Sequence, residues 1–224
     1  MFASLKDLAR QTDTQVLLST HSSSFIDMDM YRSICIVKKN NPAEGTRVWQ
    51  CQERLFAQED EKKQFNLSYW INPDRGELFF AKKVILVEGV TEKVVLPYLA
   101  KILGIFRYDY TLIDCGNKDN ILTYLTLLNK FRLRYTVVYD RDHQPHKSAR
   151  QIAHTNELSQ KIEQYLIPEL GRSIVLENDL EDELHIQANN RKAFRALQEI
   201  SHPDYKLPAR LEDKVRLVYE EGGG

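Results

Sequence analysis

The sequence predicts an α/β protein in which a parallel β-sheet is flanked by helices. Two patterns in the second half of the chain indicate this fold class. Short apolar runs rich in β-branched residues have the length of buried strands, and apolar residues at helical spacing follow them. Strands that alternate with helices are typical of parallel sheets. The predicted strands are residues 83–87, 110–114, 135–139 and 172–176.

The first of these strands and the turn after it organise the rest of the chain. Residues 83–87 are followed by Glu88 and Gly89, and from Val90 the apolar residues recur three and four apart, as in an amphipathic helix. A strand that enters a helix in this way places Glu88 at the carboxyl edge of the sheet, where open α/β sheets bind ligands. Glu92 follows four residues later, so one helical turn can bring both carboxylates toward the same point.

A second acidic group follows the predicted strand 135–139. Asp140 and Asp142 are two residues apart, so they share a face of an extended segment. Four carboxylates at two neighbouring strand ends repel one another unless a cation neutralises them. Clusters made only of oxygen ligands suit Mg²⁺ or Mn²⁺. The sequence therefore predicts a divalent-metal site formed by Glu88, Glu92, Asp140 and Asp142.

The acidic-glycine turn at one strand end and the Asp-x-Asp at a later one resemble the Toprim domain of topoisomerases, primases and some nucleases. The longer string Glu77–Glu92, ELFFAKKVILVEGVTE, is similar to the OLD (overcoming lysogenisation defect) family, whose members join an ABC-type ATPase to a Toprim nuclease. The resemblance covers roughly residues 80–220. It implies a Toprim-type sheet, a DNA substrate and two ions, Mg²⁺ or Mn²⁺, and it leaves a homo-oligomer open.

Composition and charge fit a globular protein of one or two domains. The 224 residues are 42% hydrophobic and 28% charged, which is ordinary for such proteins. No run of eighteen apolar residues and no apolar signal core occur, so neither a membrane span nor secretion is expected. Cys35, Cys51 and Cys115 form no C-x-x-C pair and predict buried reduced thiols in a cytoplasmic protein. The net charge of −1 does not by itself indicate a nucleic-acid binder.

Residues 1–75 differ in character from the rest of the chain. A predicted buried strand, Thr14–Thr20, ends at His21; this segment resembles the switch-histidine region of ABC-type ATPases, although His21 alternatively only caps a turn. No G-x-x-x-x-G-K-[ST] loop is present, so the chain cannot build a complete ATP site. We expect residues 1–75, with a hairpin over 32–52, to be the C-terminal remnant of an ATPase domain plus a linker, and ATP to bind only in the full-length protein. Residues 76–224 are expected to form the Toprim nuclease domain with a helical segment.

The loop after the predicted strand 110–114 contains two substrate-binding candidates. The resemblance implies a glycine and a basic residue at this point, so Gly116 and Lys118 are expected to face the substrate phosphates. A simple turn with a helix cap at Asp119 or Asn120 is the alternative.

A third acidic group follows the predicted strand 172–176. Glu177 and Glu181 repeat the four-residue spacing of the first acidic pair, which favours a contribution of both to the metal shell. Alternatively, Asp179 caps the helix that follows, and the acids of its first turn only complement the helix dipole.

A basic residue is expected beside the ions, because a lysine there would stabilise charge on the scissile phosphate. The predicted helix 188–200 begins with basic residues. The resemblance implies a lysine in such a position, which we assign to Lys192, with Lys206 as the competitor. A solvated surface charge is the alternative for either residue.

The predicted function is a metal-dependent DNA endonuclease or nickase, coupled in the full-length protein to its own N-terminal ATPase domain. Two cations about 4 Å apart would clamp the scissile phosphate. Glu88 is alternatively a general acid or base, since clustering raises the pKa of a carboxyl group. Strand rejoining would require a tyrosine on a further domain, which is not visible after Asp142. The alternative function is a non-catalytic regulatory or assembly module of an ATPase whose acids bind a structural ion.

Overall fold

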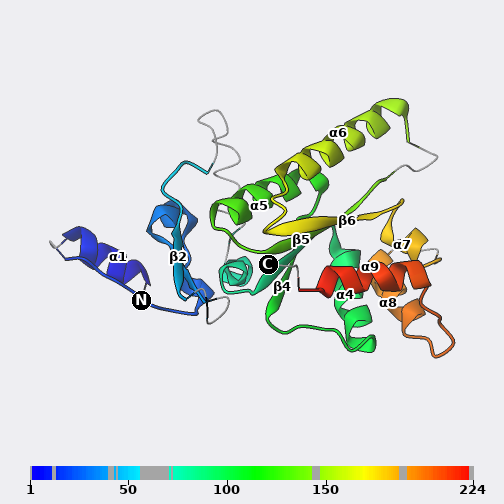
Figure 1. Ribbon diagram of the computed structural model, residues 1–224, viewed down its shortest axis with the longest axis horizontal. Helices are drawn as coiled ribbons and strands as arrows, with labels where there is room; N and C mark the ends of the chain where they lie inside the picture. Colours follow the sequence, from blue (N-terminus) through cyan, green and yellow to red (C-terminus); the bar gives the residue numbers. More distant parts are fainter. Residues whose placement is uncertain are drawn as a thin grey trace. The chain divides into compact units, whose positions relative to one another are not determined.

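The chain folds into two compact units, Met1–Phe80 and Ala81–Gly224. The first contains a two-stranded sheet and the second a four-stranded sheet (Figure 1). In this computed structural model the described residues are 2–11, 14–39, 43, 45–55, 71, 73–142, 147–186 and 191–221. The linker predicted before residue 75 falls largely outside these ranges. The assignment of residues 1–75 to an ATPase domain stays a prediction.

The first unit is built from short elements around a hairpin. Strands β1 and β2 pair antiparallel, with Ile36 opposite Trp49, which confirms the predicted hairpin. Its elements are α1 (Phe2–Gln11), η1 (Ser23–Phe25), η2 (Met28–Ser33), β1 (Cys35–Lys38), β2 (Arg47–Gln50), α3 (Pro73–Gly76) and η4 (Glu77–Phe79).

The predicted strand Thr14–Thr20 is not a strand in this structure. The segment is in no regular element, and the side chain of Leu17 is 87% exposed. A strand needs a neighbour for its N–H and C=O groups. Among the described residues of the first unit only β1 and β2 pair with each other, so the apolar run 14–20 has no sheet to join here and the prediction of a buried strand is wrong.

The second unit has a fully parallel sheet with the strand order β4-β3-β5-β6. The fold class predicted from the alternation of strands and helices is therefore confirmed. The strands are β3 (Lys83–Val87), β4 (Tyr110–Asp114), β5 (Tyr135–Asp140) and β6 (Gly171–Leu176). The helices are α4 (Val90–Ile102), α5 (Lys118–Lys130), α6 (Ala149–Tyr165), α7 (Leu180–Glu183), α8 (Lys192–Ile200) and α9 (Ala209–Tyr219).

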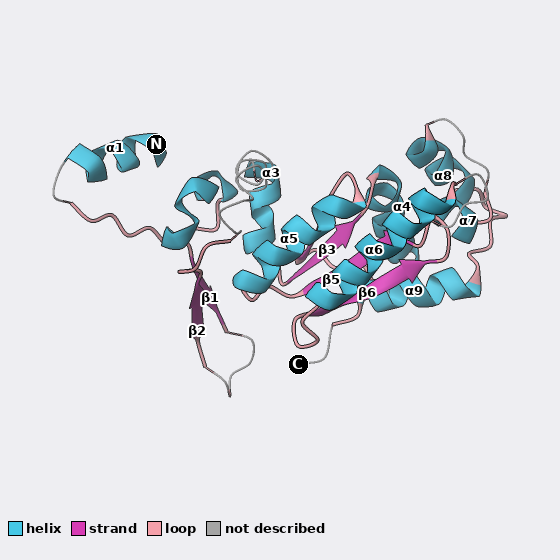
Figure 2. Cartoon of the chain, turned by 90° about the horizontal axis from the view of Figure 1, so that it is seen from above, coloured by secondary structure: helices cyan, strands magenta, loops and turns pink. Residues whose placement is uncertain are grey.

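Helices cover both faces of this sheet. Figures 1 and 2 show α5 and α6 on one face and α4 and α9 on the other. Right-handed crossovers explain this arrangement. The connection from β3 to β4 runs across the sheet in one direction, whereas those from β4 to β5 and from β5 to β6 run in the opposite direction, so their helices fall on opposite faces.

The central strand β3 is buried from both sides. Ile85 and Val87 belong to a hydrophobic cluster that includes Leu99 of α4. Val84 and Leu86 alternate to the other face of the sheet and have no exposed surface. Burial on both faces is the physical reason that the strand reads as an unbroken apolar run in the sequence.

Two helices differ from the sequence-based expectation. After the polar stretch that follows Asp142, the sequence predicts a helix from about residue 156 to residue 166. Helix α6 begins earlier, at Ala149, because Ser148 and Gln151 form a capping box that fixes its start. No helix is predicted after residue 200, yet α9 follows there and fills the core beside α4. Its buried residues, at helical spacing, are Leu211, Val215, Val218 and Tyr219.

The three cysteines are free thiols, as predicted. Cys51 and Cys115 are buried, but Cys35 is exposed. Cys35 lies on β1, where the neighbouring Ile36 takes the buried side of the strand, so the prediction of burial is wrong for this residue. None of the helices in the described ranges combines the length and apolarity that a bilayer crossing requires.

Candidate metal centre

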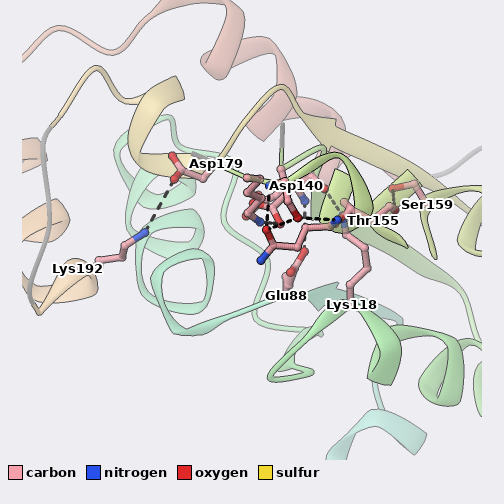
Figure 3. Close-up of polar contacts among 11 residues, drawn as sticks. Glu88, Lys118, Asp140, Thr155, Ser159, Asp179 and Lys192 are labelled. Atoms are coloured by element: carbon pink, nitrogen blue, oxygen red, sulfur yellow. Dashed lines mark hydrogen bonds and ion pairs between the residues drawn. The ribbon is translucent and has the colours of Figure 1, made fainter. Parts of the chain in front are cut away.

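The parallel register brings acidic residues from two strands to one edge of the sheet. Asp140 and Leu176, the last residues of β5 and β6, are paired with each other. Strand β3 lies on the other side of β5 and ends at Val87, so Glu88 emerges at this edge. We call it the carboxyl edge. Figure 3 shows the side chains of Glu88, Lys118 and Asp140 gathered there, with Asp179 and Lys192 further along the same edge.

The two glutamates after β3 are both held by backbone amides. The Asp140 N–H donates to Glu88 Oε2 over 3.4 Å, and the Gly89 N–H donates to Glu92 Oε2 over 3.1 Å. Glu92 is almost fully buried at the start of α4. A Cβ atom at Gly89 would lie 3.3 Å from Glu92 Oε2, so glycine at this position leaves room for the buried carboxylate.

Burial and mutual repulsion raise the pKa values of these carboxyl groups. Burial raises the pKa of Asp140 to about 9, and the charges of Glu92, Glu88 and Asp179 act in the same direction. Burial raises the pKa of Glu92 to about 7, with additional repulsion from Glu181 and Glu88. Burial also raises the pKa of Glu88. Five carboxyl groups from three segments therefore share one electrostatic environment.

The chemistry of this donor set fits a divalent cation. Asp140 Oδ1 is buried and has no hydrogen-bond partner among the described residues. An orphaned carboxylate oxygen among repelling acids is an energetic cost that a cation removes. Within the described ranges, no three His, Cys, Asp or Glu side chains already stand at metal-ligand spacing from one another. Ion binding therefore requires these carboxylates to turn toward a common point.

The third acidic group contributes Glu181, one of the two predicted residues, and Asp179 to the carboxyl edge, whereas Glu177 lies at the surface. Glu177 accepts hydrogen bonds from Arg141 at 3.2 Å and from Arg210 at 2.5 Å, which engage both of its oxygens at the surface. Asp179, two residues later, lies close enough to Asp140 to raise its pKa. In the sequence, Asp179 was recognisable only as the predicted cap of the helix that follows. Its side chain does accept a hydrogen bond from a backbone N–H at the start of α7.

Lys192 reaches the carboxyl edge from α8. Its Nζ lies 3.9 Å from Asp179 Oδ2 and 3.6 Å from Glu181 Oε1 (Figure 3 draws the contact with Asp179). Glu181 is buried and also accepts from Thr91 Oγ1 of α4 over 3.2 Å. Lys206, the competing assignment, is exposed, and no ion pair joins it to any described acid. The structure thus brings Lys192 to the acids, and its role in chemistry stays a prediction.

Lys118 faces inward, whereas the resemblance implied a contact with substrate. Its side chain is 5% exposed, its Nζ donates to the backbone oxygen of Asp140, and the ammonium lies 5.2 Å from the centroid of the Tyr139 ring. The positive charge opposes the rise in the pKa of both Glu88 and Asp140. Lys118 is therefore placed to compensate the acids, and its ammonium is not presented at the surface.

Gly116 shapes the turn between β4 and α5. Its φ of +79° lies in the region that favours glycine, and its N–H donates to Asp114 Oδ1 over 2.8 Å. The helix cap predicted for this loop is at Asn117, whose side chain accepts from the Asn120 N–H, and not at Asp119 or Asn120. A role of Gly116 toward substrate stays a prediction.

The remaining candidates occupy different surroundings. Asp142 has a left-handed backbone conformation, with φ of +61°. Its carboxylate forms an ion pair with Lys147, whereas Asp140 has a buried oxygen without a hydrogen-bond partner among the described residues. His21 lies in the first unit, with its ring centroid 5.9 Å from that of Phe80. Its nucleotide-related role stays a prediction.

Comparison with known proteins identifies a family for the core of the second unit. A family model described as overcoming lysogenization defect protein-like, TOPRIM domain, matches residues 79–142. An OLD nuclease from Thermus scotoductus is 26% identical over 140 residues, which cover 62% of this chain and 26% of that relative. The chain thus spans about a quarter of the length of this curated relative.

Two solved structures show a weaker, purely geometric likeness. They are structures of the C-terminal region of the Xanthomonas campestris pv. campestris OLD protein, phased with platinum and with mercury. They are 22% and 21% identical to this chain, each match covers 62% of it and 78% or 79% of the solved chain, and the TM-scores are 0.34 and 0.32.

The family match contains both sequence motifs that build the carboxyl edge, since it includes Glu88, Glu92 and the Asp140–Asp142 segment. These motifs also carry the resemblance seen in the sequence. Over residues 79–142 this chain matches the model of the TOPRIM domain of overcoming lysogenization defect protein-like proteins.

Proposed function

We propose that the second unit is the catalytic part of a divalent-metal-dependent DNA endonuclease or nickase. The observation that carries this proposal is the convergence of Glu88, Glu92 and Asp140 at one buried sheet edge, where burial and repulsion raise all three pKa values. Perturbed carboxyl groups in one place are characteristic of functional sites. The TOPRIM match and the nuclease named among the relatives support the same activity.

The residues that would hold two Mg²⁺ or Mn²⁺ ions are the acids of the carboxyl edge. Glu88, Glu92 and Asp140 are the main candidates, with Asp179 and Glu181 beside them and Asp142 as a further one. Bound there, the ions would supply water activation and charge stabilisation for phosphodiester hydrolysis.

The protein's own groups would orient the phosphate and move protons. Lys192 contacts Asp179 and Glu181 at 3.9 and 3.6 Å and is half-exposed, so its ammonium can turn to a phosphate oxygen and stabilise the charge that develops there. Glu88, with its raised pKa, can take or give a proton at a reacting oxygen. Lys118 holds the backbone of Asp140 in place.

A second function is compatible with one observation. Lys118 and Lys192 already contact groups of the carboxyl edge, so the protein itself compensates part of the negative charge. This is compatible with a regulatory or assembly module in which the acidic cluster binds a structural ion. For the full-length protein we propose coupling to an N-terminal ATPase domain, which rests on the resemblance of the segment ending at His21. A cytoplasmic location and a homo-oligomer belong to the same proposal.

A plasmid-nicking assay separates nuclease from structural-ion module. The purified chain is expected to convert supercoiled plasmid to nicked circles with Mg²⁺ or Mn²⁺ and to stop in excess EDTA. Asp140→Asn is expected to slow nicking by more than about 100-fold, because the substitution removes a charged ligand of the ions. Glu157→Gln is the matched control, since Glu157 is an exposed acid on α6 whose ion pair, among the described residues, is with Lys161 across one helical turn.

Two outcomes would contradict the nuclease proposal. The first is nicking that persists in EDTA, and the second is an Asp140→Asn variant that is as active as Glu157→Gln. Thermal unfolding of each variant shows that the fold is intact. Stabilisation by Mn²⁺ without any nicking would favour the structural-ion module.

A further inference from the structure

Thr91 connects the first acidic turn of the second unit to its last acidic group. It is the second residue of α4, between Val90 and Glu92, and its hydroxyl donates to Glu181 Oε1 of α7 over 3.2 Å. The two residues are 90 positions apart in the chain, and both are buried. Burial strengthens a hydrogen bond to a carboxylate, because water does not compete for either partner. Glu181 belongs to the carboxyl edge, since its charge contributes to the raised pKa of Glu92.

The position of Thr91 in its helix leaves the hydroxyl free for this contact. Inside a helix, a threonine hydroxyl often donates to a carbonyl oxygen three or four residues earlier. For Thr91 these carbonyls precede the start of α4, and the oxygen of Val87 already accepts from the Cys115 N–H over 2.9 Å. Thr126 is the contrast, because it lies within α5 and its hydroxyl donates to the oxygen of Leu122 in the same helix over 2.9 Å. The hydrogen bond of Thr91 is therefore a tertiary contact.

Glu181 is held differently from other acids of the carboxyl edge. Three of these acids accept a hydrogen bond from a backbone N–H, which the fold itself keeps in place: Glu88, Glu92 and Asp179. Glu181 instead accepts from the Thr91 side chain, and Lys192 Nζ approaches the same oxygen, Oε1, to 3.6 Å. Among the described residues, no hydrogen bond engages Glu181 Oε2. One oxygen is thus fixed by Thr91, and the other is available to a cation.

Lys192 could not replace Thr91 in this role. Half of its side chain is exposed, and its ammonium is carried on a flexible stem of four carbons. A buried, β-branched threonine has a stiff side chain and holds its hydroxyl in one place. A carboxylate that is free to turn binds an ion more weakly, because binding must first order it.

We propose that Thr91 is a positioning residue of the candidate metal centre, whose hydroxyl fixes the Glu181 carboxylate and leaves Oε2 to a divalent cation. The threonine would touch neither the ion nor the substrate, and it would act through Glu181. Removing such a partner of a metal ligand typically costs about 10- to 100-fold in metal affinity or activity. The inference rests on the proposed function, because it takes Glu181 as one of the residues that hold the ions.

The test measures Mn²⁺ binding to the purified chain without DNA, from the loss of the electron paramagnetic resonance signal of free Mn²⁺. Thr91→Val removes the hydroxyl and keeps the branched shape. It is expected to raise the Mn²⁺ concentration for half-occupancy about 10-fold or more. Thr91→Ser keeps the hydroxyl and is expected to stay within about threefold of the parent, since it gains only some side-chain freedom. Thr126→Val is the matched control, because it removes a hydroxyl bonded within its own helix, and it is expected to bind Mn²⁺ as the parent does.

A double-mutant cycle shows whether Thr91 acts through Glu181. Glu181→Gln removes the charged ligand, so adding Thr91→Val to it is expected to change Mn²⁺ binding by less than about twofold. Circular dichroism and thermal unfolding without metal establish that each variant is folded. Should Thr91→Val unfold, Thr91→Cys takes its place with the same expected direction, because a thiol is only a weak donor.

Four results would overturn the inference. Thr91→Val could bind Mn²⁺ as well as Thr126→Val does, or Thr91→Ser could be as impaired as Thr91→Val. The effect of Thr91→Val could be equally large in the Glu181→Gln background, or the parent chain could bind no Mn²⁺.

The nuclease proposal is tested separately, in the EDTA-controlled nicking assay of the unsubstituted chain. Mn²⁺ binding that depends on the Thr91 hydroxyl in a chain that does not nick refutes only the nuclease. Nicking by a chain in which Thr91→Val leaves Mn²⁺ binding unchanged refutes only the positioning role.

Discussion

Lys83 and Lys118 are two buried lysines at opposite edges of the same parallel sheet, and they meet different partners. Lys83 begins β3, and its Nζ donates to the backbone oxygens of Val218 and Glu220 at 2.7 and 2.6 Å. These oxygens lie at the C-terminal end of α9, where the helix dipole favours a cation. Lys118 begins α5 at the carboxyl edge, and its Nζ donates to the backbone oxygen of Asp140.

The balance of charge around the two lysines is also different. At the amino edge, where the strands of the sheet begin, acids and bases neutralise one another. Arg172 pairs with Glu220 at 2.6 Å, and Lys82 pairs with Glu221 at 2.5 Å. At the carboxyl edge, five acids surround Lys118 and Lys192, and the pKa values of Glu92 and Asp140 rise to about 7 and about 9.

This difference separates a structural edge from a functional one. Ion pairs that neutralise each other hold the end of α9 onto β3 and β6 and leave no demand for an external ligand. Crowded acids with one orphaned oxygen, Asp140 Oδ1, cost stability unless a cation or a proton joins them. The repulsion that a bound cation relieves adds to the free energy of binding that cation. This is the physical basis for placing the metal centre at the carboxyl edge.

Removing the internal cation of the carboxyl edge gives the largest expected change in stability. Lys118→Met is expected to lower the free energy of unfolding by about 3 kcal/mol, because the buried acids lose their compensating charge. Urea denaturation at neutral pH without divalent ions measures this. Lys161→Met is the control, since Lys161 forms an exposed one-turn pair with Glu157 worth less than about 0.5 kcal/mol. Equal stability of the two variants would show that Lys118 does not compensate the acids.

Neutralising each of the two acids after β6 in turn tests which of them belongs to the metal centre. Asp179→Asn is expected to reduce Mg²⁺-dependent nicking by about 10- to 100-fold, because Asp179 shares the electrostatic environment of Asp140. Glu177→Gln is expected to change nicking by less than about twofold, since both carboxylate oxygens of Glu177 are engaged by surface arginines. Rates at saturating plasmid compare the two variants. A larger loss in Glu177→Gln would return Glu177 to the metal shell.

The pH dependence of stability probes the amino edge. Burial lowers the pKa of Lys83 from 10.5 to about 8, with a further contribution from Arg172. Between these two values the unfolded chain binds more protons than the folded one, so Lys83 makes stability rise with pH from 8 upward. The rise between pH 8 and 9.5 is expected to be about 2 kcal/mol.

Lys83→Met is the variant that isolates this effect. The difference between its unfolding free energy and that of the parent, followed in urea from pH 7 to 9.5, cancels contributions from groups common to both. The difference is expected to shift in favour of the parent as pH rises. A difference independent of pH would mean that Lys83 keeps an ordinary pKa and that the amino edge compensates its charge fully.

The sequence was sufficient for the parts of the fold that depend on local pattern. The run Val84–Val87 has the composition of a doubly buried strand, and the turn at Glu88 and Gly89 marks its carboxyl end. Helix α9 was not predicted, although its apolar residues have regular helical spacing. The start of α6 could have been predicted from the capping box at Ser148. In the first unit, residues 14–20 have strand composition but no strand beside them.

The sequence alone determined that Glu88, Glu92 and Asp140 lie at one edge, because parallel strands bring their carboxyl ends together and the acids follow directly. Only the tertiary structure decided which further groups join them. It placed Asp179 inward and Glu177 outward, and it turned Lys118 away from solvent. Those choices depend on which cations from distant helices, such as Arg210 of α9, reach each side chain. No spacing within a single segment encodes such a contact, since the free energy of a charge is set by its neighbours in space.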